Sequence, residues 1–314
     1  LGSLSQLSSL HLGNNNLSGK IPLSLQQCKQ LITLDLGNNK LSGSIPEWTG
    51  ESLSTLEVLR LRSNLLDGNI SMQLSPLTSL QVLDLADNKF SGTLPPSFGN
   101  FSAMTMIPNE SEPVLPEYMS SYYIENLLIT MKGLELTFTT VLSLVTSLDL
   151  SDNNISGEIP KEFTNLHGLV SLNLSGNHLT GRIPENIGAM GQLESLDLSM
   201  NNLSSTIPTS ISNLNFLSHR NLSHNNLSGR IPTGTQLQTF NDPSIYIGNQ
   251  YLCGQPLLEK CPGDEPAGGS TAHGREETLD ENDSEMIWFY VSLSPGFVVG
   301  FWGFLGAVML KKST

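Results

Sequence analysis

The stretch LVSLNLSGNHLTGRIP, from Leu169 to Pro184, is the clearest copy of a sequence that recurs along this chain. Its pattern is L-x-x-L-x-L-x-x-N-x-L-x-G-x-I-P. The second Leu of the pattern recurs at Leu10, Leu34, Leu59, Leu83, Leu148, Leu172 and Leu196, with Arg220 in the equivalent place of the eighth copy. The steps are 24 residues long, except one of 25 and one of 65 between Leu83 and Leu148. A fixed period in this range predicts a solenoid of stacked repeats that share one apolar core.

Each position of the pattern has a physical role. The two Leu of L-x-L point one way and the middle residue points the other way, which predicts a strand with one buried face. Asn177 follows where the chain leaves the strand, and its amide can pair with backbone groups of the turn. Gly181 suits a backbone with positive φ, and Pro184 fixes an extended step. The predicted fold is therefore an α/β leucine-rich-repeat solenoid with a parallel sheet on its concave face and short 3-10 or irregular segments on its convex side.

The same pattern divides the chain. We expect four repeats over residues 1–100, an insertion over 101–144, four repeats over 145–232, a C-terminal cap over 233–262, an acidic linker over 263–285, one transmembrane helix over 286–310 and a short tail over 311–314. The insertion has an apolar second half, which predicts a functional loop more than a disordered spacer. Because the chain begins inside a repeat without a polar cap, the sequence suggests that an N-terminal part is missing.

Charge and cysteine usage limit the possible functions. The net charge of −14 argues against nucleic-acid binding, and much of it lies in the linker. Cys28 stands in an otherwise apolar position, which indicates a buried free thiol. Cys253 and Cys261 bracket a short loop after the last repeat and are predicted to form a disulfide. A metal site there would need two more ligands nearby, which are absent, and a disulfide indicates a secretory compartment.

The segment 286–310 contains no charged residue, and at about 1.5 Å per residue it is long enough to cross a bilayer. Lys311 and Lys312 follow it, so the positive-inside rule places the repeats outside and the C-terminus in the cytosol, a single-pass type I arrangement. Ser292, Gly296 and Gly300 recur every four residues and give the helix one face of small residues on which a partner helix can pack.

Ten N-x-S/T sequons predict glycosylation, although the repeat pattern itself generates most of them. They are Asn16, Asn69, Asn100, Asn109, Asn154, Asn173, Asn202, Asn221, Asn226 and Asn282.

The sequence contains few residues arranged for catalysis or metal binding. The six histidines show no metal-ligand spacing, and no catalytic motif is present, so no cofactor or metal and no enzymatic activity are expected. Four aspartates share the middle position of L-D-L, namely Asp35, Asp84, Asp149 and Asp197. Such a row resembles the pair of carboxylates that hydrolyses glycosidic bonds, but a solvated face of a repeat protein is the stronger interpretation. Because the concave positions vary on a fixed frame, they suit recognition of a protein or peptide.

Together these parts resemble the plant leucine-rich-repeat receptor-like proteins, which include the fungal-xylanase receptors and the Cf-type resistance proteins. The insertion resembles the island domain of that family, with Tyr123 followed after eight residues by Lys132-Gly133. The resemblance implies a kinase-less receptor at the plasma membrane that recognises an extracellular protein or peptide ligand in plant defence. It also implies an adaptor receptor-like kinase that binds the membrane helix at Ser292, Gly296 and Gly300. A co-receptor kinase would contact Tyr123, Lys132, Gly133, Asp149, Asn173, Asp197 and Asn221.

The sequence leaves two alternatives open. One is an inhibitor of a cell-wall enzyme, which shares the repeat but lacks the membrane segment and the island. The other is a truncated receptor kinase or a non-functional fragment. Two residues depart from the pattern, namely Ser205 in place of the glycine and Arg220 in place of a core Leu. A buried Arg is costly unless its charged end reaches water, so Arg220 indicates either such an extended side chain or a loosened last turn, and the sequence does not decide between them.

Overall fold

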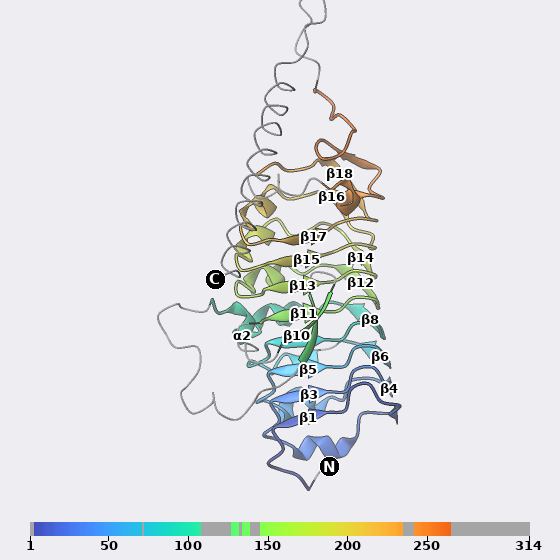
Figure 1. Ribbon diagram of the computed structural model, residues 1–314, viewed down its shortest axis with the longest axis vertical. Helices are drawn as coiled ribbons and strands as arrows, with labels where there is room; N and C mark the ends of the chain where they lie inside the picture. Colours follow the sequence, from blue (N-terminus) through green and yellow to red (C-terminus); the bar gives the residue numbers. More distant parts are fainter. Residues whose placement is uncertain are drawn as a thin grey trace, which may run out of the picture. The chain divides into compact units, whose positions relative to one another are not determined.

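The computed structural model describes residues 3–70, 72–107, 127–131, 134–138, 145–234 and 242–264 (Figure 1). The chain separates into two compact units, 1–264 and 265–314, and the second lies outside the described residues. In the described part, no helix is both long and apolar enough to cross a membrane. The predicted membrane segment 286–310 belongs to the part that is not described.

The L-x-L stretches form one parallel sheet of eight strands along the solenoid (Figure 1). In spatial order these strands are β1 (Ser9–His11), β3 (Thr33–Asp35), β5 (Val58–Arg60), β7 (Val82–Asp84), β11 (Ser147–Asp149), β13 (Ser171–Asn173), β15 (Ser195–Asp197) and β17 (His219–Asn221). The insertion does not interrupt the stacking, because β11 pairs directly with β7 and Leu148 lies opposite Leu83. The predicted solenoid with a parallel concave sheet is confirmed.

Stacked asparagines connect one repeat to the next. Asn177 donates from Nδ2 to the carbonyls of Leu150, Leu174 and Ser175 at 2.9, 3.2 and 3.1 Å. Its Oδ1 accepts from the Ile155 backbone N–H of the preceding repeat at 3.0 Å. Equivalent bonds between repeats are made by Asn39, Asn64, Asn88, Asn153, Asn201, Asn225 and Asn249. The predicted role of this asparagine is confirmed.

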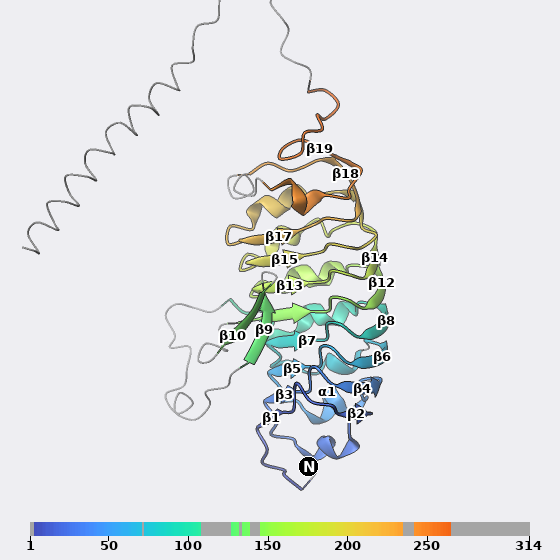
Figure 2. The ribbon, with the colours of Figure 1, turned by 45° about the vertical axis from the view of Figure 1, so that its right-hand side comes forward.

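Two further parallel sheets cover one flank of the solenoid, and the sequence pattern does not predict them (Figure 2). The longer one has six strands, namely β14 (His178–Thr180), β12 (Asn154–Glu158), β8 (Lys89–Thr93), β6 (Leu65–Asn69), β4 (Lys40–Gly43) and β2 (Ser18–Gly19). Near the C-terminal end a shorter sheet contains β16 (Ser204–Thr206), β18 (Asn226–Arg230) and β19 (Tyr251–Cys253). We call this surface the lateral face.

Short helices form the convex side, as predicted. They are η1 (Leu23–Gln27), α1 (Trp48–Ser52), η2 (Met72–Leu74), η3 (Pro96–Asn100), α2 (Ser102–Thr105), η5 (Lys161–Asn165), η6 (Ile187–Ala189), η7 (Thr209–Asn213) and η9 (Pro243–Tyr246). The core lies between these helices and the concave sheet, and it is one continuous cluster. Cys28 is a fully buried free cysteine within it, in agreement with its predicted apolar role.

The glycine of each repeat has the backbone conformation that the pattern predicts. Gly181 has a φ of +73°, a left-handed conformation that costs glycine little. Ser205, which replaces this glycine in the next repeat, has the same φ of +73°. A non-glycine residue in this region is destabilising by about 1–2 kcal/mol. The departure at Ser205 therefore leaves the fold of the turn unchanged at a small energetic cost.

The insertion begins after residue 104, later than the predicted start at residue 101. Phe101 and Met104 are fully buried, and the Met104 carbonyl accepts from the Gly168 N–H at 2.9 Å. These residues of the predicted insertion therefore pack in the solenoid core. Within the insertion, β9 (Leu127–Met131) and β10 (Leu134–Phe138) form an antiparallel hairpin. This agrees with the strand-like composition of the insertion's second half.

Candidate binding surface on the concave sheet

The middle residues of L-x-L form one row across the concave sheet. The register places His11 opposite Asp35, then Arg60, Asp84, Asp149, Asn173, Asp197 and Asn221, one residue per strand. Neighbouring strands are about 4.8 Å apart, so each of these side chains lies beside those of the adjacent repeats. The structure thus brings together the concave residues that were predicted from sequence, and their chemistry differs between the two halves of the row.

In the first half, charged side chains form a buried cluster. The Arg60 guanidinium contacts Asp35 Oδ1 at 3.0 Å through Nη1 and Asp84 Oδ2 at 3.5 Å through Nε. Arg62 contacts the same Asp84 oxygen at 3.3 Å. Arg60, Asp84 and Asp149 are only 1%, 3% and 2% exposed. Treating this row as a solvated face is therefore wrong for Asp84 and Asp149.

Burial determines the acid–base behaviour of this cluster. It raises the pKa of Asp84 to about 7, with a further contribution from the Asp149 carboxylate, while Arg62 and Arg60 act in the opposite direction. Burial also raises the pKa of Asp149, against the hydrogen bonds that Ser151 donates to it. Two carboxyl groups on adjacent strands, both removed from water, favour a state in which the pair retains a proton.

This arrangement predicts an unusual dependence of stability on pH. Between about pH 4 and pH 7, folded Asp84 binds more protons than unfolded Asp84, so its contribution to the free energy of unfolding falls as pH rises. We expect denaturant unfolding of Asp84→Asn to show a shallower loss of stability over this range than the wild type. An identical pH dependence in the two proteins would contradict the assignment of this proton to Asp84.

In the second half of the row, each concave residue is fixed by a serine two positions later. Ser151 donates to Asp149 Oδ1 at 2.7 Å, and Ser199 donates to Asp197 Oδ1 at 2.6 Å. The amide oxygens of Asn173 and Asn221 accept from Ser175 and Ser223 in the same way, at 2.7 and 2.8 Å. The backbone N–H of each serine donates to the same oxygen. The result is a regular polar surface whose side-chain positions are set before any partner binds.

The last repeat is joined to the cap by the residue that departs most from the pattern. Arg220 takes the place of a core Leu and is 2% exposed. Its guanidinium lies over the Tyr246 ring, 5.1 Å from the centroid, and donates to the Tyr246 hydroxyl. Burial lowers the pKa of Arg220, and the contacts with Tyr246 oppose this shift. Arg220 therefore holds the cap to repeat eight through a buried cation–π contact.

This contact predicts a different outcome for two substitutions. Tyr246→Phe keeps the ring but removes the hydroxyl that accepts from Arg220, so we expect it to destabilise the cap by about 1–3 kcal/mol. Arg220→Leu combined with Tyr246→Phe replaces the polar pair by apolar side chains and should recover much of that loss. Hydrogen exchange of residues 217–253 measures both effects, and equal protection in the single and double variants would contradict the coupling.

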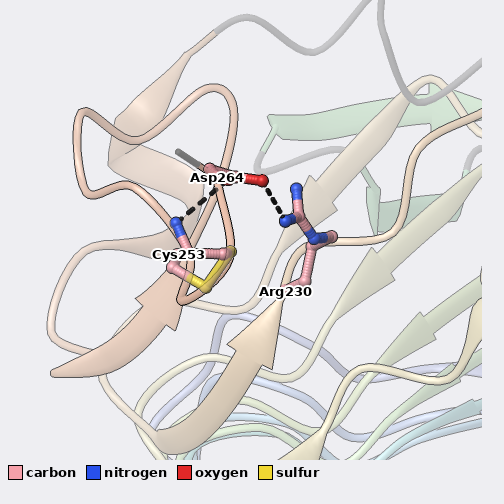
Figure 3. Close-up of a disulfide and its surroundings, with 4 residues drawn as sticks. Arg230, Cys253 and Asp264 are labelled. Atoms are coloured by element: carbon pink, nitrogen blue, oxygen red, sulfur yellow. Dashed lines mark hydrogen bonds and ion pairs between the residues drawn. A yellow bond between two sulfur atoms is a disulfide. The ribbon is translucent and has the colours of Figure 1, made fainter. Parts of the chain in front are cut away.

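The cap also contains the disulfide between Cys253 and Cys261 (Figure 3). Beside it, Arg230 of β18 forms an exposed ion pair with Asp264 at 2.5 Å, and the Cys261 N–H donates to the same carboxylate (Figure 3). An exposed ion pair of this kind contributes little stability by itself. The disulfide instead fixes the chain where the solenoid ends.

Several predicted site residues cannot be placed. The island residues Tyr123, Lys132 and Gly133, the helix residues Ser292, Gly296 and Gly300, and the sequons at Asn109 and Asn282 lie outside the described residues. Within the described part, no group of three or more His, Cys, Asp or Glu side chains could hold a metal ion.

Four segments of the chain match known repeat families. Family models for leucine-rich repeats match residues 5–50, 79–101, 134–179 and 192–214. The chain is 53% identical to receptor-like protein EIX1 of Solanum lycopersicum over 228 residues, 69% of this chain and 22% of the relative. It is 60% identical to receptor-like protein EIX2 of the same plant over 196 residues, 62% of this chain and 19% of the relative. The chain belongs to the plant leucine-rich-repeat receptor-like proteins.

The chain spans about a fifth of the length of these curated relatives. Solved structures agree with the fold of this receptor-like protein. The ectodomain of the Arabidopsis thaliana receptor kinase GASSHO1/SCHENGEN3, in complex with CASPARIAN STRIP INTEGRITY FACTOR 2, is 30% identical with a TM-score of 0.59, over 83% of this chain and 32% of that one. The Arabidopsis receptor kinase HAESA, in complex with the peptide hormone IDA and the co-receptor SERK1, is 28% identical with a TM-score of 0.55, over 82% of this chain and 40% of that one.

Proposed function

We propose that this receptor-like protein is a cell-surface receptor without a kinase domain that recognises an extracellular protein or peptide ligand in plant defence. The observation that carries the proposal is the concave row of polar side chains, fixed in position by hydrogen bonds, in a chain 53–60% identical to EIX1 and EIX2. A surface of varied polar groups on a rigid sheet suits a protein or peptide partner better than a small molecule, which favours a deep apolar pocket.

Two separate parts of the chain carry the proposed partner contacts. The concave residues Asp149, Asn173, Asp197 and Asn221, together with Tyr123, Lys132 and Gly133 of the island, are the proposed contacts for ligand and co-receptor kinase. HAESA, which shares this fold, was solved in complex with a peptide hormone and a co-receptor. Segment 286–310 is the proposed single membrane span, with the repeats outside the cell. Ser292, Gly296 and Gly300 are the proposed contact with the helix of an adaptor receptor-like kinase.

Co-precipitation of the tagged chain from plant membranes tests this function. We expect a receptor-like kinase among the recovered proteins, and we expect Gly296→Leu with Gly300→Leu to reduce its recovery without affecting delivery to the cell surface. Asn173→Arg with Asp197→Arg should instead reduce ligand-dependent recovery of the co-receptor. Thr180→Arg, on the exposed lateral strand β14, is the matched control for an added charge away from the concave face.

A second candidate is an inhibitor of a cell-wall enzyme, because the polar concave face suits a secreted enzyme as well as a signalling partner. In that case the chain would be recovered as a soluble secreted protein bound to a wall enzyme, with no kinase. That result would contradict the receptor proposal.

A further inference from the structure

Two groups of sequons lie in different structural environments. The first group is Asn16, Asn154, Asn202 and Asn226, which share one position of the repeat, at the first residue of the lateral strand or two residues before it, in repeats one, five, seven and eight. The second group is Asn173 and Asn221, which lie in the concave row at β13 and β17. Sequence alone treats all six as equivalent, because both groups contain the same Asn-apolar-Ser motif.

The lateral asparagines present free amides. All four are exposed, and none of their side-chain nitrogens makes a hydrogen bond to the described residues. The residue after each of Asn154, Asn202 and Asn226 is buried, which directs the asparagine away from the core. A glycan attached to Nδ2 at these positions would extend into solvent from the edge of the lateral face, without displacing a native contact.

The concave asparagines are held in a ladder with aspartates. Their oxygens accept from the serines two positions later, and Asn221 Nδ2 lies 3.5 Å from Asp197 Oδ2 in the preceding repeat. Asn173 lies beside Asp149 in the same register, and its amide helps to lower the pKa of that carboxyl group against the effect of burial. Side chains one repeat away are only about 4.8 Å distant on each side. A sugar on either nitrogen would have to displace these neighbours.

We infer that the folded receptor carries N-glycans at Asn16, Asn154, Asn202 and Asn226 on the lateral face, and none at Asn173 and Asn221. The inference rests on the extracellular location in the proposed function, and it deepens that function. Glycans then occupy the lateral face at repeats one, five, seven and eight, while the concave row between Asp149 and Asn221 stays bare for a protein partner.

Glycopeptide mass spectrometry tests this assignment on the 314-residue chain, expressed in plant leaves behind a secretory leader and recovered from the cell surface. We expect modified peptides for the four lateral sites and unmodified peptides for Asn173 and Asn221. Because trypsin leaves Asn221 and Asn226 in one peptide, between Arg220 and Arg230, fragment ions must locate the sugar. A glycan at Asn173 or Asn221 would overturn the assignment and show that modification is complete before the concave strands form.

Two new sequons provide a matched comparison. Lys40→Asn creates Asn-Leu-Ser at the lateral position of repeat two, and Asp197→Asn creates Asn-Leu-Ser in the concave row. The second variant should fold, since asparagine already occupies the same place at Asn173 and Asn221. We expect the first variant to gain one glycan and the second to gain none. Gain of a glycan by both variants would overturn the inference, and so would absence of glycans from the four lateral sites. Neither outcome depends on the native location of the chain, because the added leader directs every variant to the cell surface.

Discussion

Arg60→Leu is expected to destabilise repeats two to five by about 3 kcal/mol. The substitution removes one of the two guanidinium groups that face the buried Asp84 carboxylate. The guanidinium of Arg60 is 1% exposed and contacts Asp35 and Asp84, one on each side. We place the effect near the lower end of the usual range for breaking a buried pair for two reasons. Arg62 still faces Asp84 at 3.3 Å, and Arg60 Nη2 makes no hydrogen bond in the described structure, so the native pair is imperfect.

The control for this prediction removes both charges. In Arg60→Leu with Asp84→Leu, two apolar side chains replace the buried pair, and such replacements are often neutral or stabilising. Hydrogen exchange resolved along the chain is the appropriate measurement, because a solenoid can lose structure locally without unfolding as a whole. We expect strands β3 to β11 to lose protection in the single variant and to regain it in the double variant. Equal loss in both variants would show that Arg60 acts through its volume instead of its charge.

The sequence predicts the position of the residues in this cluster but not their burial. The period and the L-x-L pattern predict the concave sheet, and the register then places Arg60, Asp84 and Asp149 side by side. Their burial depends on contacts between distant segments, which a repeat pattern does not encode. The pattern therefore predicts which residues share a face, but not which of them are removed from water or have a shifted pKa.

The lateral sheet and Arg220 illustrate two further limits. Strands such as β14 are only a few residues long, and they follow the asparagine turn so closely that no separate strand signal is visible in the sequence. Arg220 is a departure from the pattern whose compensation, Tyr246, lies 26 residues away in the cap. The repeat pattern stops before that residue, so it cannot pair the two.

Asn177→Ala is expected to have a comparable effect, a loss of about 3 kcal/mol at the junction of repeats five and six. The variant removes the acceptor of the buried Ile155 N–H and the donors for the carbonyls of Leu150, Leu174 and Ser175. Each buried polar group that loses its partner costs about 1–3 kcal/mol. Because the variant leaves several such groups unpaired, its total cost exceeds that of losing a single hydrogen bond. No side chain of similar size other than an amide both donates and accepts in this way.

The solenoid supplies its own graded control for this effect. Asn15 occupies the same position in repeat one, but it is exposed, and among the described residues it donates only to Leu12 and Gly13 of its own repeat. Asn15→Ala should therefore cost less than about 1 kcal/mol, and His178→Ala, an exposed neighbour of Asn177, should fall within about 0.5 kcal/mol of the wild type. Denaturant unfolding together with hydrogen exchange at Ile155 distinguishes these cases. If Asn15→Ala were as destabilising as Asn177→Ala, the asparagine would stabilise the turn within each repeat, and the stacking between repeats would have to depend on the leucine core alone.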